Sequence, residues 1–279
     1  MFTAKVKNNR GDSLMLFPSK DYAISIEGLT SGRASLNFST VGTNDGSIYN
    51  SGRKENRNLV FNIRPLRNIE KNRIALYKIF RLNAPVQFYF KNGSRDVFIE
   101  GYVEAADGDL FELGQSLQVS VICNSPNFKE LAATVTDIST VVPLFSFPFA
   151  IAAEGMEFSA IERAPEKNVY NSGDTESGII IELLATGEVN DPIIYDEFGG
   201  YFAIAINMVK GDKITINTNK GEKAVTLLKD GKTTNIINKV QPNPTWFILQ
   251  PGDNLFTYEA ENQDLLQIVF KHYSQYEGV

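Results

Sequence analysis

The sequence offers few side chains suited to catalysis or metal binding. It contains one histidine, His272, and one cysteine, Cys123. A Cys–His couple would need these two residues to converge from distant parts of the chain, and a zinc site would have to rely on carboxylates. Cys123 follows Val121-Ile122, which is typical of a small buried apolar residue. We therefore predict no catalytic, cofactor-binding or metal-ligating residue.

Three short motifs suggest chemistry but lack the spacing it requires. The acidic run Glu104–Glu112 places its glycine wrongly for an EF-hand calcium loop. Gly231-Lys232-Thr233 resembles the end of a phosphate loop, but Thr226 stands where that loop needs glycine. Arg10-Gly11-Asp12 is a three-residue coincidence. Paired carboxylates for glycoside hydrolysis stay open, because such pairs have no fixed spacing in sequence.

The composition indicates a globular protein held together by packing. The chain has 279 residues, of which 43% are hydrophobic and 22% charged, and its net charge is -6. A lone cysteine provides no disulfide framework, and the acidic balance disfavours a surface built to bind nucleic acid. The first 12 residues lack the apolar core of a secretory signal. The longest apolar stretch, Val141–Ala153, is interrupted by two prolines and is too short to span a bilayer.

Short alternating segments separated by Gly, Asn and Asp predict a mainly β protein. Tyr22–Glu27 and Leu59–Ile63 alternate with a period of two, as half-buried strands do. Val97–Val103 and Leu117–Ile122 repeat the pattern, and the Asp- and Gly-containing segment Ala105–Asp109 between them favours a turn. These two segments predict a β-hairpin.

One segment, from Asn68 to Arg81, has helical periodicity instead. Asn68 is a suitable N-cap and Pro85 prevents much continuation beyond the end. The residues expected to face a sheet are Ile69, Arg73, Leu76, Tyr77 and Phe80.

A proline-punctuated apolar stretch, Val141–Phe149, cannot be a regular helix and predicts a junction between domains 1–140 and 141–279. The strands expected beyond it are Gly178–Leu184, Tyr201–Ile206, Lys213–Asn217, Ala224–Leu228, Trp246–Leu249, Leu255–Tyr258 and Leu265–Phe270. Asp230-Gly231 predicts a two-residue hairpin, and the turn Pro251–Asn254 is expected to join the strands that contain Trp246 and Phe256 in the same way. This half predicts an antiparallel sandwich or jelly roll.

A four-residue echo links the two halves. Tyr49-Asn50-Ser51-Gly52 and Tyr170-Asn171-Ser172-Gly173 precede strand-like runs, and we interpret them as shared turn chemistry, not as a repeat architecture.

The first half contains a definite succession of motifs: Asn58–Ile63, the helix Asn68–Arg81, Val86–Phe90, Val97–Glu104 and Ser120–Phe128 with its Ser-Pro-Asn-Phe turn. The second half contains Val169–Asp174, Gly211–Thr218, Thr245–Leu249, Pro251–Asn254 and Tyr276–Val279. In this order the two sets resemble the N-terminal domain and the C-terminal galectin-like sandwich of siphophage distal tail proteins. The segment Leu144–Phe149 is similar to the junction between those domains.

The resemblance implies a structural hub without enzymatic activity or cofactor. In that family the N-terminal domain, a β-sandwich-like fold with one helix and a β-hairpin, forms a homo-hexameric ring through which DNA passes. The ring joins the tail tube protein to a tail-associated fibre or lysin protein. The C-terminal sandwich projects outward and docks receptor-binding proteins. Such a protein is found at the virion's tail tip, and in the host cytoplasm during assembly.

The residues expected to contact neighbouring subunits or partner proteins are Leu76, Phe80, Phe145, Phe147 and Phe149. Aromatic stripes of this kind serve equally well as internal core. Two other hypotheses stay open. The sandwich itself could bind cell-wall carbohydrate through stacked aromatic rings such as Trp246 or Tyr201, or paired carboxylates could make a hydrolase.

Overall fold

The computed structural model describes residues 2–42, 45–109, 111, 114–137, 140–143, 159–162 and 166–279. The chain divides into two compact units. Unit 1 comprises Met1–Leu131 together with Gln275–Val279, and unit 2 comprises Ala132–Ser274. Each unit contains its own hydrophobic core.

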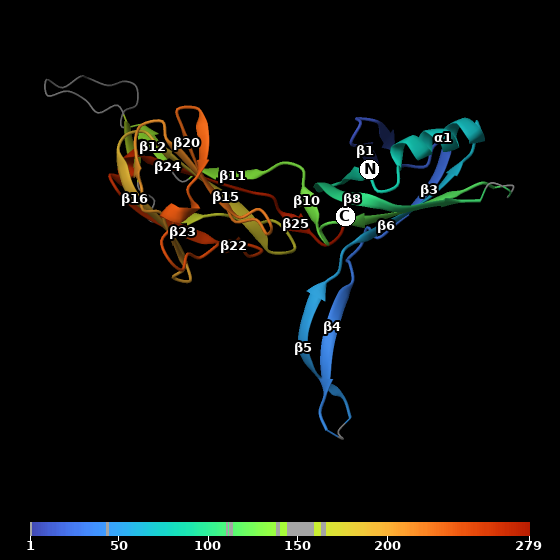
Figure 1. Ribbon diagram of the computed structural model, residues 1–279, viewed down its shortest axis with the longest axis horizontal. Coiled ribbons are helices and arrows are strands. Elements are labelled where there is room, and N and C mark those ends of the chain that lie inside the picture. Colours follow the sequence, from blue (N-terminus) through green and yellow to red (C-terminus); the bar gives the residue numbers. More distant parts are fainter. Residues whose placement is uncertain are drawn as a thin grey trace. The chain divides into compact units, whose positions relative to one another are not determined.

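Unit 1 is built on a curved antiparallel sheet in the order β2-β1-β7-β8-β9-β6-β3 (Figure 1). Two short strands, β10 and β25, extend it beside β8, and α1 is the only α-helix in the described part of the chain. The elements are β1 (Thr3–Asn8), β2 (Ser13–Met15), β3 (Tyr22–Glu27), β4 (Ala34–Thr40), β5 (Ser47–Lys54), β6 (Asn58–Pro65), α1 (Ile69–Ile79), β7 (Pro85–Asn92), β8 (Arg95–Gly108), β9 (Leu117–Cys123), β10 (Phe128–Glu130) and β25 (Gln275–Tyr276).

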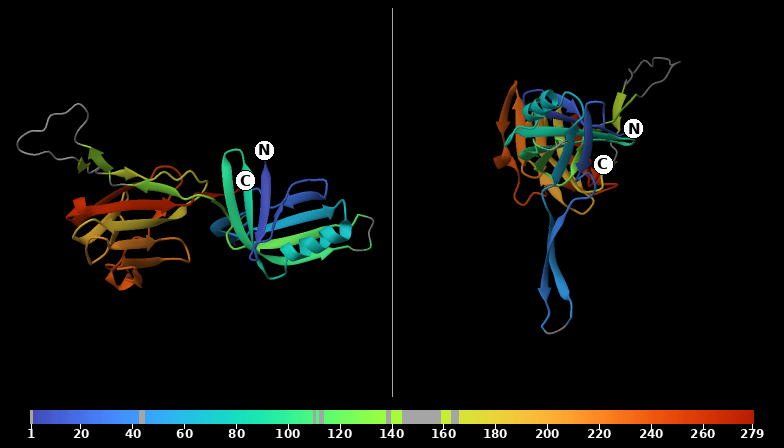
Figure 2. Two further views of the ribbon diagram at one scale, coloured as in Figure 1. Left: turned by 90° about the horizontal axis from the view of Figure 1, so that it is seen from above. Right: turned by 90° about the vertical axis from the view of Figure 1, so that its right-hand side faces the viewer.

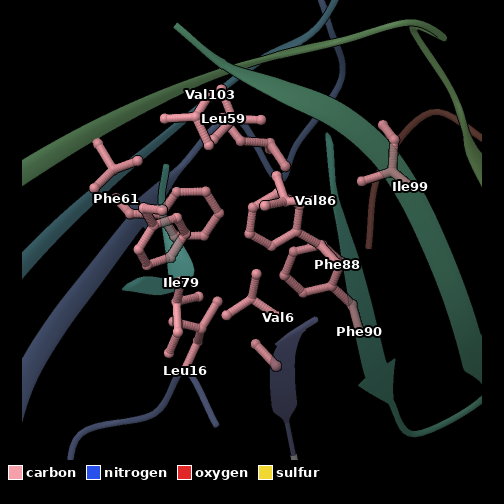
Figure 3. Packing of buried hydrophobic residues seen from close by; sticks show 14 of the residues in the cluster. Val6, Leu16, Leu59, Phe61, Ile79, Val86, Phe88, Phe90, Ile99 and Val103 are labelled. Carbon is pink, nitrogen blue, oxygen red and sulfur yellow. The ribbon is translucent and has the colours of Figure 1, made fainter. Parts of the chain in front are cut away.

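The core of unit 1 forms where the sheet curls around α1 (Figures 2 and 3). Alternate residues of each strand point to this one face. The ring of Phe61 on β6 stacks on that of Phe88 on β7, with centroids 4.7 Å apart, and lies 5.9 Å from Phe80, which follows α1. The Asn8 side chain donates to the Lys78 carbonyl at 3.2 Å. These contacts fix the helix against the sheet.

Unit 2 is a β-sandwich. One sheet has the order β11-β24-β15-β19-β20-β21, with β22 beside β15, and the other has the order β14-β23-β16-β17, with β18 beside β16. Phe256 on β23 and Phe270 on β24 belong to different sheets, and their rings meet 4.9 Å apart. The core therefore lies between the two layers.

The elements of unit 2 are β11 (Thr134–Asp137), β12 (Thr140–Pro143), β13 (Ser159–Glu162), β14 (Lys167–Asn168), β15 (Ser177–Ala185), β16 (Val189–Asp196), β17 (Tyr201–Ala203), β18 (Asn207–Met208), β19 (Lys213–Asn217), β20 (Ala224–Lys229), β21 (Lys232–Asn235), β22 (Ile248–Leu249), β23 (Leu255–Glu261) and β24 (Leu266–His272), with short 3-10 turns η1 (Ile237–Lys239) and η2 (Gln263–Leu265).

The mainly β class is confirmed, and so are several turns. The Asp230-Gly231 hairpin joins β20 to β21 with Lys229 opposite Lys232, and both turn residues have positive φ. The predicted hairpin of β8 and β9 also forms.

Four local expectations were wrong. Ala105–Gly108 is not a turn but continues β8, with a bulge after Val103. Tyr49–Gly52 lies in β5, whereas Tyr170–Gly173 is irregular apart from a bridge at Asn171, so the echo is not shared turn chemistry. Two strands are shorter than predicted: only Ile248–Leu249 of the predicted Trp246–Leu249 forms a strand, β22, and only Tyr201–Ala203 of the predicted Tyr201–Ile206 forms β17. The turn Pro251–Asn254 connects two different sheets instead of closing a hairpin.

The helix also differs from the expectation in its orientation. Asn68 is the N-cap residue, but its side chain makes no capping hydrogen bond because its backbone is left-handed, with φ 43°. The residues that face the core are Leu76, Ile79 and Phe80, while Ile69 and Tyr77 are exposed. The predicted stripe included the exposed pair and omitted Ile79.

The division between the compact units falls after Leu131, earlier than the junction expected at 140/141. The reason is strand pairing: β11 pairs with β24 of unit 2, and Gln275–Tyr276 pairs with β10 of unit 1. The assignment of separate functions to 1–140 and 141–279 stays a prediction.

Candidate assembly surfaces

The helix residues expected to contact partners are buried. Leu76 is 0% and Phe80 2% exposed, so both side chains belong to the core of unit 1. The outward side of α1 instead presents Ile74 and Tyr77, which are three residues apart and both exposed. A partner that contacts this helix would meet those two side chains. Phe145, Phe147 and Phe149 lie outside the described residues.

Sequence reasoning missed a long, fully exposed hairpin formed by β4 and β5, which we call the arm (Figure 1). Every residue of both strands is exposed, so the arm's side chains pack mainly against one another. Between Ala34 and Gly52 the sequence has a single charged residue, Asp45. An isolated two-stranded hairpin is only marginally stable in water, so an arm of this composition is suited to being covered by another chain.

The arm has one apolar face. Phe38 on β4 lies opposite Tyr49 on β5, and their rings meet edge to face with centroids 5.7 Å apart. Leu36 lies opposite Gly52, where an added Cβ would come within 2.7 Å of the Tyr49 hydroxyl. Because Gly52 has no side chain, the Tyr49 side chain can lie along the strand over this position. Leu36, Phe38 and Tyr49 are 50–56% exposed, which is unusual for neighbouring large apolar side chains.

The opposite face of the arm is mainly polar. Asn37 lies opposite Ser51, and Ser39 lies opposite Ile48. The Asn50 side chain donates a hydrogen bond to the Ser39 hydroxyl at 2.5 Å. The arm is therefore amphipathic, and its apolar face is the candidate contact surface.

The two aromatic residues of the carbohydrate hypothesis are engaged within unit 2. Trp246 meets the Phe202 ring edge to face, with centroids 5.3 Å apart, and the Lys223 ammonium lies 5.1 Å from the indole centroid. Tyr201 donates its hydroxyl to the Pro242 carbonyl at 3.1 Å. A sugar that stacked on Trp246 would have to displace the lysine. The structure therefore gives no specific support to sugar binding at these residues.

Titratable groups do not assemble into a reactive centre in the described residues. No group of three or more His, Cys, Asp or Glu side chains there is placed to hold a metal ion. Cys123 is buried, and burial raises the pKa of its thiol to about 12 although Arg57 lies nearby. Burial alone would raise the pKa of Glu182, but hydrogen bonds from Lys271 and Lys213 outweigh it and lower the pKa. None of the described helices is long and apolar enough to cross a membrane.

His272 is 1% exposed on β24. Burial lowers the pKa of its imidazole, and the Tyr170 backbone offsets part of this shift. Neither ring nitrogen makes a hydrogen bond of acceptable geometry with the described residues. The ring is therefore held neutral in the folded state.

We expect this burial to make unit 2 less stable in mild acid. Because the folded pKa lies below the unfolded value near 6.5, the unfolded state binds more protons in that interval. The contribution of the neutral His272 ring to stability is fully present well above pH 6.5. It falls by at most about 1.4 kcal/mol per pH unit as the pH drops toward the folded pKa. Urea unfolding of the wild type and His272→Gln from pH 7.5 to 5 measures the difference in slope. Equal slopes would contradict the expectation.

Comparisons with known proteins place these surfaces in context. Residues 172–273 match the family described as "Siphovirus-type tail component, C-terminal domain". No curated protein matches the sequence. Among solved structures, SPP1 Dit (gp 19.1), described as a paradigm of the hub adsorption apparatus in phages that infect Gram-positive bacteria, is similar with a TM-score of 0.71 and 12% identity, over 99% of each chain.

Two structures of the phage P2 baseplate in its activated conformation, with Ca and with Sr, are also similar. Their TM-scores are 0.51 and 0.50, each at 10% identity over the full length of both chains. The sequence match to siphovirus-type tail components thus covers residues 172–273, and the whole chain shares the fold of SPP1 Dit.

Proposed function

We propose that this chain is a siphophage distal tail protein, a non-enzymatic structural subunit that closes into a homo-hexameric ring at the tail tip. The observation that carries the proposal is the arm, whose apolar face has no cover in the described chain. A ring of identical subunits needs two different complementary surfaces on each copy. The arm supplies one such surface, and the scarcity of charge between Ala34 and Gly52 suits burial against a second copy.

The further roles follow from the class of protein. The ring formed by the region 1–140 would join the tail tube protein to the tail-associated fibre or lysin protein and leave a channel for DNA. The region 141–279 would dock a receptor-binding protein. The ring would assemble in the host cytoplasm before joining the virion. The relatives' description as hub and baseplate structures supports this arrangement.

The proposal is tested on the purified protein alone. Light scattering should give a mass about six times that of the 31.0 kDa chain, and negative-stain images should show rings with a central hole. A monomer at every concentration would contradict ring formation by this chain alone. The protein that covers the arm would then be another tail protein.

A further inference from the structure

The chain returns to unit 1 after it has completed unit 2. Residues Gln275–Val279, which we call the return segment, are the only part of unit 1 that follows Leu131 in sequence. Its strand β25 pairs antiparallel with β10, with Tyr276 opposite Phe128. Tyr276 is buried in the core of unit 1, and Val279 packs against that core. The return segment therefore completes both the sheet and the core of unit 1.

A buried arginine binds the return segment to two earlier parts of unit 1, the 28–30 loop and Pro126. Arg57 is 4% exposed. Its guanidinium donates to the Glu277 carbonyl at 2.6 Å, to the Pro126 carbonyl at 2.8 Å, to the Thr30 carbonyl at 2.5 Å and to the Gly28 carbonyl. All four acceptors are main-chain oxygens, so this recognition depends on backbone geometry more than on side-chain identity.

Further contacts hold the return segment along its length. Arg95 donates to the Gly278 carbonyl at 2.6 Å, and its guanidinium lies 4.5 Å from the centre of the Tyr276 ring. The Val279 amide donates to the Leu29 carbonyl at 3.0 Å. Gly278 passes so close to Leu29 that an added Cβ would lie 3.3 Å from its carbonyl oxygen. The 28–30 loop and the return segment are thus packed backbone to backbone.

Unit 1 is incomplete without this segment. Phe128 and Lys129 would lose their partners in β25, the core would lose Tyr276, and the Arg57 cation would lose the Glu277 carbonyl. A buried cation that loses a hydrogen-bond partner is costly, and so is an uncovered strand edge. Because the return segment follows unit 2 in sequence, the ribosome makes it only after all of unit 2.

We propose that the return segment is a folding clasp that makes assembly of unit 1 conditional on a chain synthesised through unit 2. Before residues 275–279 dock, the 28–30 loop, β10 and the part of the core next to Phe128 are loosely held. Once they dock, unit 1 becomes rigid. Chains that stop within unit 2 are thereby excluded from assembly. The assembly half of this inference rests on the proposed ring, whereas the clasp itself does not.

The clasp is tested by hydrogen–deuterium exchange on the full-length chain carrying Tyr276→Ala. Amide exchange in residues 127–130 and at Val279, whose amide donates to Leu29, should be at least tenfold faster than in the wild type, and exchange in β15 and β19 of unit 2 should be unchanged. The matched control is Tyr273→Ala, which removes an exposed tyrosine just before the return segment. Tyr276→Phe keeps the ring over Arg95 and should restore wild-type exchange.

Either of two results would overturn the clasp: unchanged exchange in Tyr276→Ala, or the same acceleration in Tyr273→Ala. Complete opening of unit 1 with unit 2 still protected would support it. The assembly half is measured by mixing each variant with wild type and counting its share of the rings. We expect the rings to contain at least tenfold less of the Tyr276→Ala variant than of the Tyr273→Ala variant. Equal shares would refute the assembly half of the proposal. If the wild type forms no ring, the proposed function fails, and the exchange data alone still decide the clasp.

Discussion

A double variant of the arm, Phe38→Ser with Tyr49→Ser, is expected to convert the proposed rings to monomers at micromolar concentration. Both side chains are large, apolar and about half exposed, and they contact one another across the hairpin. Aromatic anchors at the centre of an interface each contribute about 2 kcal/mol or more. Losing both weakens each contact between neighbours by about a thousandfold. Light scattering before and after dilution measures the change.

The controls for the arm separate a lost contact from a lost fold. Ser35→Ala with Ser51→Ala changes the opposite, polar face of the same hairpin and should leave the rings intact. The aromatic double variant should unfold in urea like the wild type, because its two side chains lie outside the buried core of unit 1. Rings that persist without Phe38 and Tyr49 would show that another surface closes them, and loss of rings in the serine control would show that the whole hairpin is fragile.

The arm also shows where sequence reasoning fails. Strands such as β19 (Lys213–Asn217) were predicted with the correct bounds because one face is buried and the other is not, which produces strict alternation. The arm buries neither face in its own chain. Leu36 and Phe38 alternate, but the residues around them are Ser, Asn, Thr and Gly, which also favour turns. The only available signal was the scarcity of charge around these apolar residues.

Sequence reasoning failed at the helix and at the return segment for different reasons. The period of α1 was recognised, but its orientation depends on which turns the curved sheet reaches, and only Leu76, Ile79 and Phe80 point into the core. Tyr276–Val279 was assigned to the C-terminal sandwich, but the structure places it in unit 1. Its side chains do not reveal this, because Arg57 recognises the backbone carbonyl at Glu277. Long-range contacts of that kind leave no periodicity in the sequence. The predicted contacts at Leu76 and Phe80 therefore correspond to core side chains, with Ile74 and Tyr77 on the outside.

Arg57→Met is expected to lower the free energy of unfolding of unit 1 substantially. Methionine retains an apolar chain of similar length beside Phe128, whose ring lies 4.5 Å from the guanidinium carbon. The carbonyls of Gly28, Thr30, Pro126 and Glu277 lose their charged donor. Burial already lowers the pKa of this guanidinium, with Cys123 and Glu277 partly offsetting the shift, so removing the cation also relieves a desolvation cost. The net loss should be about 3 kcal/mol.

The matched control is Lys54→Met, which removes a cation from the same part of unit 1. Lys54 pairs with the Glu277 carboxylate at 2.6 Å, but both side chains are more than 40% exposed, and exposed ion pairs contribute about 0.5 kcal/mol or less. Urea unfolding, and amide exchange in residues 127–130, measure both variants. A loss in Arg57→Met as small as that in Lys54→Met would mean that water replaces the guanidinium at all four carbonyls. The return segment would then be held by Tyr276 and strand pairing, and not by the buried arginine.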